Sequence, residues 1–210
     1  YLNIHTHKLI KNSEGIHILN LEKDNIPMKT YCSSGIHPWY ILDFDLEFML
    51  RKVSENLTFT QCVFLGECGI DKTIEIPLAL QKEVFIAQLD INNNFQKPVV
   101  LHCVRAYEEI LAIIKNYEYS FIFHGFNKNV VLAKQLVAKS YYLSFGEALL
   151  KSEKIQQAFK EIPLKYIFLE TDDTDISIEI LYLKAAELKQ ITVERLQLEI
   201  QANYNKIIKQ

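Results

Sequence analysis

Paired cysteines, long apolar runs and a strong excess of either charge are all missing from this chain of 210 residues. The four cysteines show no CxxC spacing and stand at Cys32, Cys62, Cys68 and Cys103. Scattered thiols of this kind are usually small buried apolar residues, so a disulfide framework is not expected. The net charge of −3 provides no general attraction to nucleic acid, so any phosphate binding has to be local.

We expect neither a membrane span nor an export signal from this sequence. The longest apolar runs fall far short of the roughly 20 residues that a bilayer span requires, and no basic segment precedes an apolar stretch near residue 1. Repeats, low-complexity segments and linkers rich in Pro, Gly or Ser are absent as well. We therefore expect one domain over residues 1–210, a cytoplasmic location without membrane contact, and a monomer.

Short runs rich in β-branched and aromatic residues alternate with helical patterns along most of the chain. The runs predict strands at 2–5, 15–19, 30–34, 61–65, 98–102, 120–124, 141–145 and 166–170. The helical patterns cover 43–56, 77–93, 106–117, 129–139, 147–160, 178–189 and 192–209. Eight strands alternating with helices predict an α/β fold, a compact TIM-like (β/α) barrel. Only about ten residues connect the first three strands, so one or two outer helices near the N-terminus should be missing or shortened.

Polar residues stand at or just after the carboxyl ends of these predicted strands. They are His5, His7, His37, Glu67, His102, His124, Glu170 and Asp172, with 66–69 expected as a loop after the strand at 61–65. In (β/α) barrels the loops that follow the strands at this end carry the active site. The sequence therefore predicts that these side chains meet at one barrel mouth.

His5 and His7 stand two positions apart in the sequence. In a strand their side chains therefore point to the same face, where both can bind one metal ion. Each histidine taken alone could instead be a solvated or hydrogen-bonded core residue. Several buried polar groups at one mouth would each cost roughly 1–3 kcal/mol without partners, and a shared metal removes this cost. Mixed imidazole and carboxylate ligands in this number exceed what one tetrahedral zinc needs. We expect two divalent metal ions, drawn from zinc, manganese, nickel or magnesium, and imidazoles favour the transition metals.

Taken together and in order, the motifs resemble the TatD-like metal-dependent hydrolases, a branch of the amidohydrolase-type barrels that includes deoxyribonucleases. The matching stretches are "HTH" at 5–7, "GIHP" at 35–38, "GECGID" at 66–71, Gln81 with "FIAQL" at 85–89, "PVVLH" at 98–102, "FHGF" at 123–126 and "LETD" at 169–172. The resemblance implies a ligand set of six residues, namely His5, His7, Glu67, His102, His124 and Asp172. His5, His7, Glu67 and Asp172 would surround one ion, and Glu67 would bridge to a second ion held by His102 and His124. Because Asp172 can accept a proton through its second oxygen, we expect it to be the general base.

The resemblance also implies roles in binding substrate. His37 would hold a substrate phosphate, although a hydrogen bond that stabilises its turn is an equal alternative. The family's arginine after the fifth strand falls on Val104, and Arg105, displaced by one, is either a phosphate ligand or a solvated charge. Asn3 stands where the family usually has aspartate, which predicts weaker metal binding through the loss of a supporting carboxylate. The acidic residues at 173–175 would repel a polyanion.

These features favour a metal-dependent deoxyribonuclease that cleaves phosphodiester bonds, with DNA or another phosphodiester as its substrate. The same centre could instead hydrolyse an ester or amide, because fold and metal site are shared across chemistries. A degenerate barrel that only binds a partner is the third alternative. Trp39, Tyr40 and Phe126 stand beside the motifs, where they could stack on bases or pack in the core.

Overall fold

The computed structural model describes residues 1–9, 15–21, 30–43 and 45–208, which fall into two compact units. Unit 1 comprises Tyr1–Leu19 and Ile122–Gln210, and unit 2 comprises Asn20–Phe121. The strand order follows the chain from β1 to β8. The predicted alternation of strands and helices is therefore present, and the ends of most elements differ from the prediction by a few residues.

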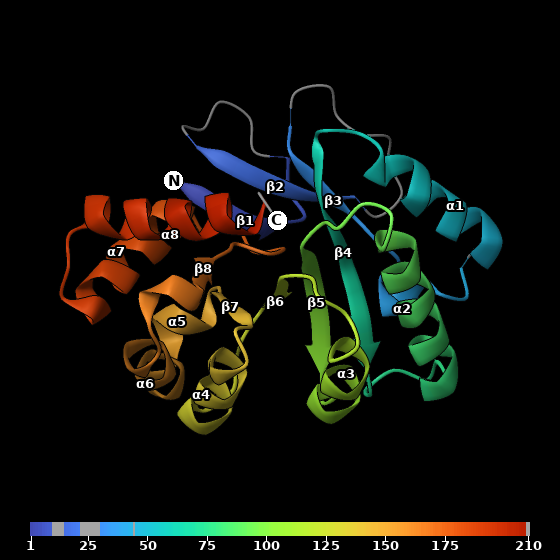
Figure 1. Ribbon diagram of the computed structural model, residues 1–210. Coiled ribbons are helices and arrows are strands. Elements are labelled where there is room, and N and C mark those ends of the chain that lie inside the picture. Colours follow the sequence, from blue (N-terminus) through green and yellow to red (C-terminus); the bar gives the residue numbers. More distant parts are fainter. Residues whose placement is uncertain (10–14, 22–29, 44, 209–210) are drawn as a thin grey trace. The chain divides into compact units, whose positions relative to one another are not determined.

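Unit 2 consists of three parallel strands and the helices that follow them (Figure 1). Its elements are β3 (Cys32–Ser34), the 3-10 turn η1 (Pro38–Tyr40), α1 (Leu46–Leu57), β4 (Cys62–Asp71), α2 (Leu78–Asn92), β5 (Val99–Val104) and α3 (Tyr107–Ile114). The side chain of Asp45 caps α1 by accepting a hydrogen bond from the backbone N–H of Phe48 at 2.7 Å. Both α1 and α2 pack against β4, which explains why nearly all of its residues are buried.

Unit 1 contains the two ends of the chain and most of the remaining elements (Figure 1). They are β1 (Leu2–Thr6), most of β2 (Ile16–Leu21) and β6 (Phe121–Phe123), α4 (Val130–Ala138), β7 (Tyr142–Phe145), α5 (Ala148–Lys151), α6 (Glu153–Glu161), η2 (Leu164–Tyr166), β8 (Ile167–Leu169), α7 (Ile178–Lys189) and α8 (Val193–Ile207). The strands β6, β7 and β8 pair in parallel, and a parallel bridge between Thr6 and Asp172 joins β1 to the segment after β8. The hydroxyl of Tyr182 on α7 donates to the carbonyl of Leu2 at 3.0 Å and fastens this helix to β1.

The prediction for the fourth strand was wrong at its carboxyl end. We expected the strand to end at residue 65 with a loop at 66–69, but β4 continues to Asp71 and pairs with β5 as far as Val104. Gly66 and Gly69 are therefore strand residues with positive φ, at 128° and 148°. A Cβ atom on Gly69 would overlap the backbone carbonyl of His102 on β5. These glycines allow two backbones to approach closely and do not mark a loop.

The helix predicted at 147–160 is two helices, because Ser152 adopts an extended conformation between α5 and α6. Leu149 and Ile155 are both buried. On one continuous helix a separation of six residues would place these side chains about 120° apart around the axis. The break at Ser152 allows both of them to reach the core.

The predicted lack of full helices between the first three strands concerns segments 10–14 and 22–29, which lie outside the described residues. The four cysteines are free thiols. Among the residues that the structure describes, no helix is long and apolar enough to cross a bilayer. A single domain over the whole chain stays a prediction.

Candidate metal centre

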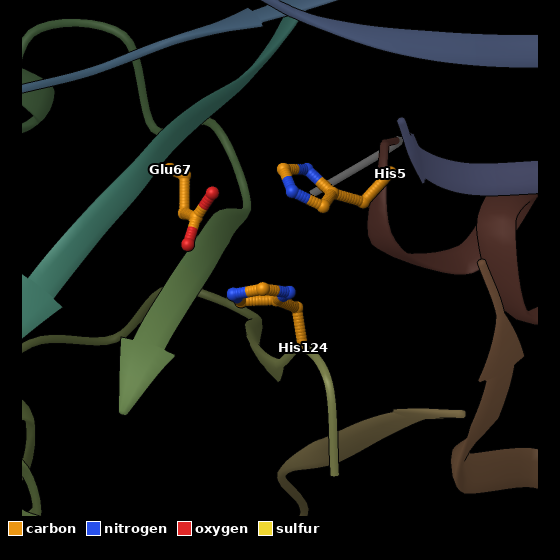
Figure 2. Close-up of side chains that lie close together, drawn as sticks. All are labelled: His5, Glu67 and His124. Atoms are coloured by element: carbon orange, nitrogen blue, oxygen red, sulfur yellow. The ribbon is translucent and has the colours of Figure 1, made fainter. Parts of the chain in front are cut away.

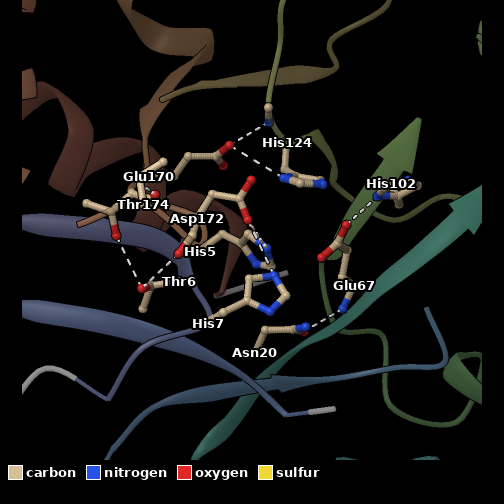
Figure 3. Close-up of polar contacts among 12 residues, drawn as sticks. His5, Thr6, His7, Asn20, Glu67, His102, His124, Glu170, Asp172 and Thr174 are labelled. Atoms are coloured by element: carbon tan, nitrogen blue, oxygen red, sulfur yellow. Dashed lines mark hydrogen bonds and ion pairs between the residues drawn. The ribbon is translucent and has the colours of Figure 1, made fainter. Parts of the chain in front are cut away.

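In unit 1, two histidines from β1 and its end meet a carboxylate that follows β8 (Figure 3). The Nε2 atoms of His5 and His7 lie 3.7 Å and 3.4 Å from Oδ1 of Asp172. Backbone hydrogen bonds hold this arrangement, since Asp172 N donates to His5 O at 3.2 Å and His7 N donates to Asp172 O at 3.0 Å. His5 is fully buried, whereas the side chain of Asp172 is 36% exposed. Asp172 is also held in the left-handed region, with φ of 53°, and such backbone strain is common at functional sites.

His124, which follows β6, lies beside His5 (Figure 2), with the two ring centres 4.7 Å apart. Its Nδ1 atom lies 3.4 Å from Oε1 of Glu170. Glu170 is fully buried, and the same oxygen accepts a hydrogen bond from Gly125 N at 2.5 Å. Burial alone would raise the pKa of Glu170, but the neighbouring His124 and His5 and the hydrogen bonds lower it, which favours the carboxylate. A buried carboxylate in this position orients the His124 imidazole.

In unit 2, His37, Glu67 and His102 form a second buried cluster. The Nδ1 atom of His102 lies 2.5 Å from Oε1 of Glu67, a contact that Figure 3 shows. The Nε2 atom of His37 lies 3.3 Å from the same oxygen and 3.0 Å from Nδ1 of His102. His37 therefore lies among the predicted metal ligands. Its Nδ1 also accepts the backbone N–H of Trp39 at 3.2 Å, so the turn-stabilising hydrogen bond is present as well.

A second carboxylate, Asp71 at the end of β4, lies on the far side of the His102 ring. Its Oδ2 atom is 3.4 Å from Nε2 of His102 and accepts the indole N–H of Trp39 at 2.8 Å. Burial would raise the pKa of Asp71, but hydrogen bonds from Thr73, Trp39 and His102 outweigh it and lower the pKa. Asp71 stays ionised and keeps both neighbouring rings in place.

Buried amide side chains hold the backbone of unit 2 in place through hydrogen bonds. Sequence reasoning had assigned them no role. The Oδ1 atom of Asn20 accepts the backbone N–H of Glu67 at 2.8 Å (Figure 3). Gln81 accepts the backbone N–H of Asp71 at 2.8 Å, and Gln88 accepts that of Ile36 at 2.6 Å. Gln81 and Gln88 stand in the stretches that resemble the family, but the resemblance assigned them no role, and no pattern singled out Asn20, whose partner Glu67 lies 47 residues away. Glu170 was noticed at its strand end, but only the packed structure places it against His124.

The donor atoms of both clusters fit divalent cations. Within each group, nitrogen and oxygen ligand atoms lie within 4.8 Å of one another. The separations of 3.4 and 3.7 Å around Asp172 are too long for good hydrogen bonds. They suit ligands that share an ion at about 2.0–2.2 Å, because such ligands stand roughly 3 to 3.5 Å apart. Imidazole and carboxylate donors suit zinc, manganese or nickel better than magnesium.

Arg105 does not contact a predicted ligand in any interaction that the described residues show. It follows β5 in a left-handed conformation, with φ of 54°, and its side chain is exposed. Its role in phosphate binding stays a prediction. An exposed guanidinium at the start of α3 equally fits a solvated charge.

Asn3 is fully buried and contacts Thr171, the residue before Asp172. Its Nδ2 donates to Oγ1 of Thr171 at 2.8 Å, and its Oδ1 accepts the backbone N–H of Thr171 at 3.1 Å. The hydroxyl of Thr171 in turn donates to Thr6 at 3.2 Å. The amide therefore fastens the segment that carries Asp172 to β1.

Asn3→Ala should lower the free energy of unfolding by about 2–3 kcal/mol, because it leaves the buried N–H of Thr171 without its acceptor. Asn3→Asp keeps an acceptor at this position and should lose less. Urea denaturation followed by circular dichroism measures both variants. An Asn3→Ala protein as stable as the parent would contradict this role.

Imidazole and carboxylate ligands at the carboxyl ends of parallel strands define the class of metal-dependent hydrolases built on (β/α) barrels. The chain belongs to the family described as TatD related DNase, whose family model matches residues 4–209. This confirms the resemblance seen in the motifs.

Individual relatives agree with the family. The chain is 30% identical over 159 residues to the uncharacterized metal-dependent hydrolase YcfH of Escherichia coli, covering 72% of this chain and 57% of YcfH. It is 29% identical over 147 residues to the human 3'-5' RNA nuclease TATDN2, covering 66% of this chain and 19% of that protein. The chain spans only 50–59% of the length of the first curated relatives that it matches.

The fold is shown by solved structures. The TatD homologue YJJV of E. coli matches with a TM-score of 0.78 at 18% sequence identity, over 90% of this chain and 84% of its own. The predicted fold class, a TIM-like barrel of parallel strands with intervening helices, is confirmed.

Proposed function

We propose that this protein is a metal-dependent nuclease that hydrolyses phosphodiester bonds of DNA. The observation that carries the proposal is the pair of imidazole and carboxylate clusters, one around Asp172 after β8 and one around Glu67 within β4. Membership of the TatD related DNase family supports a hydrolase. The predicted ligands His5, His7, His124 and Asp172 belong to unit 1, and Glu67 and His102 belong to unit 2.

The cofactors in this proposal are two divalent metal ions, drawn from zinc, manganese, nickel or magnesium. Such ions would supply Lewis acidity toward a phosphoryl oxygen and would lower the pKa of a water molecule toward neutrality. The protein's own part begins with Asp172. Its carboxylate is 36% exposed, so water can reach it, and it serves as the general base that accepts the proton.

In unit 2, Glu67 holds His102 and His37 in place through its Oε1 atom and contributes its charge to metal binding. His37 is 8% exposed and is our candidate for contact with the substrate phosphate. Arg105 is the second candidate.

The acidic residues at 173–175 oppose the binding of a polyanion, and the structure supplies a partial offset. Lys8 forms an ion pair with Asp175 at 2.5 Å, so one of the negative charges has a close counter-charge. The pair is largely exposed and adds little stability. Its effect is on the local potential that an approaching phosphate meets.

A manganese-supplemented assay tests this function. After treatment with EDTA, the protein should cleave neither single-stranded DNA nor a generic phosphodiester, and adding Mn²⁺ should restore cleavage of both. His102→Ala, prepared in the same way, should stay inactive. An RNA strand in parallel tests whether the substrate class includes RNA, as the name of human TATDN2 suggests for that protein.

An acyl ester substrate distinguishes the proposed nuclease from the main alternative, a hydrolase of esters or amides. Cleavage of the ester without cleavage of any phosphodiester would replace the nuclease with an ester or amide hydrolase. A protein that retains no metal and cleaves nothing would leave only a binding role. A cytoplasmic location and a monomeric state complete the proposal, and they rest on the sequence.

A further inference from the structure

Trp39 differs from the other aromatic residues that stand beside the motifs. Phe126 is buried and packs edge-on against Phe145, with ring centres 5.6 Å apart, so it belongs to the core. Tyr40 is half-buried. Trp39 is 52% exposed although it lies in the turn η1 directly after His37.

The exposed indole is held in one place by two directional contacts. Its N–H donates to Oδ2 of Asp71 at 2.8 Å, and its ring meets the ring of His37 edge-on, with centres 5.0 Å apart and planes at 86°. The ring of His102 lies 6.1 Å away, also edge-on. An exposed ring that is fixed in this way loses little conformational entropy when a flat ligand covers it.

Other exposed aromatic side chains of unit 2 lie in different surroundings, away from the residues that Trp39 contacts. Phe48 on α1 lies beneath the guanidinium of Arg51, which is 5.4 Å from the ring centre. Phe59 is 51% exposed but stands just before β4, whereas Asp71, the partner of Trp39, ends this strand of ten residues. The two ends of β4 are about 30 Å apart, because a strand rises roughly 3.3 Å per residue.

The charge of the chain makes an aromatic contact useful to a nuclease. With a net charge of −3, phosphate contacts alone provide little attraction for a nucleic acid. Stacking of a base on an aromatic side chain contributes about 1–3 kcal/mol and needs no particular base. A base must leave its duplex stack before it can cover such a ring.

We infer that Trp39 is the stacking platform for a nucleobase next to the phosphodiester that is cleaved, and that it makes the enzyme prefer single strands and frayed ends. This inference rests on the proposed nuclease function. Through Trp39 the enzyme distinguishes nucleic acids from phosphodiesters that carry no base.

Fluorescence gives a direct test, because Trp39 is the only tryptophan in the chain. The probes are a short oligo(dT) and an abasic strand of equal length, both with phosphorothioate linkages that resist cleavage. Oligo(dT) should quench the tryptophan emission of the metal-loaded protein, and the abasic strand should not. Equal quenching by both strands, or none by oligo(dT) despite measured binding, would overturn the inference.

Kinetics provide a second readout. Trp39→Ala should lower the ratio of kcat/KM for single-stranded DNA to kcat/KM for a small phosphodiester without bases by roughly 5- to 150-fold. Trp39→Phe keeps a ring but lacks the N–H that binds Asp71, and should recover most of this ratio. If Trp39→Phe instead behaves as Trp39→Ala does, the bond to Asp71 is what matters and stacking is refuted.

Phe59→Ala is the matched control and should leave the ratio unchanged, because it removes an equally exposed ring at the other end of β4. The outcomes separate the two proposals. If the parent protein cleaves DNA but the ratio does not respond to Trp39→Ala, only the stacking role is lost. If the parent cleaves neither substrate with any metal, the nuclease function itself fails.

Discussion

Glu67→Gln should lower kcat/KM for phosphodiester cleavage by about 10³-fold or more, with loss of bound metal. The carboxylate is 2% exposed, and its Oε1 atom contacts both His102 and His37. Glutamine has the same size and keeps the backbone hydrogen bond to Asn20. It lacks the negative charge that metal binding requires, so the loss should reflect chemistry and not unfolding.

Elemental analysis of the purified variant and steady-state kinetics measure the two parts of this prediction. Glu55→Gln on the exposed side of α1 is the matched control, since the carboxylate of Glu55 forms a loose ion pair with Arg51 at 3.9 Å. The control should keep its metal and its activity. If Glu67→Gln binds as much metal and turns over as fast as the parent protein, Glu67 is not part of the metal centre.

Asp172→Asn should lower kcat by about 10²- to 10⁴-fold and change KM far less, because the amide can no longer accept a proton. Asparagine is the suitable replacement for a structural reason. Residue 172 has a φ of 53°, and asparagine tolerates this left-handed conformation better than most residues. The backbone bonds to His5 and His7 do not depend on the side chain and should persist.

The exposed neighbour Asp173 provides the control for charge alone. Asp173→Asn removes one negative charge from the same loop and should keep kcat within about twofold, since surface charges act mainly on association. Single-turnover measurements on metal-saturated proteins separate the chemical step from binding. Unchanged turnover in Asp172→Asn would exclude it as the general base.

The sequence by itself predicted the alternation of strands and helices and, outside β4 and β5, the polar residues at or after the strand ends. These features are local, because a strand of alternating or continuous apolar residues and a capped helix are encoded within a few neighbouring positions. The spacing of His5 and His7 predicted that they act together, and both lie around Asp172. The order of the motifs predicted the family, which the family model confirms.

The extent of β4 and the break at Ser152 depended on contacts between distant segments. Glycines that signal a loop in isolation became strand residues because β5 lies close to Gly69. The contacts of Glu170 with His124, of Asn3 with Thr171 and of Trp39 with Asp71 were also decided only in the tertiary structure. Each joins side chains through strand register and packing, and no local pattern of residues encodes which atoms meet across that distance.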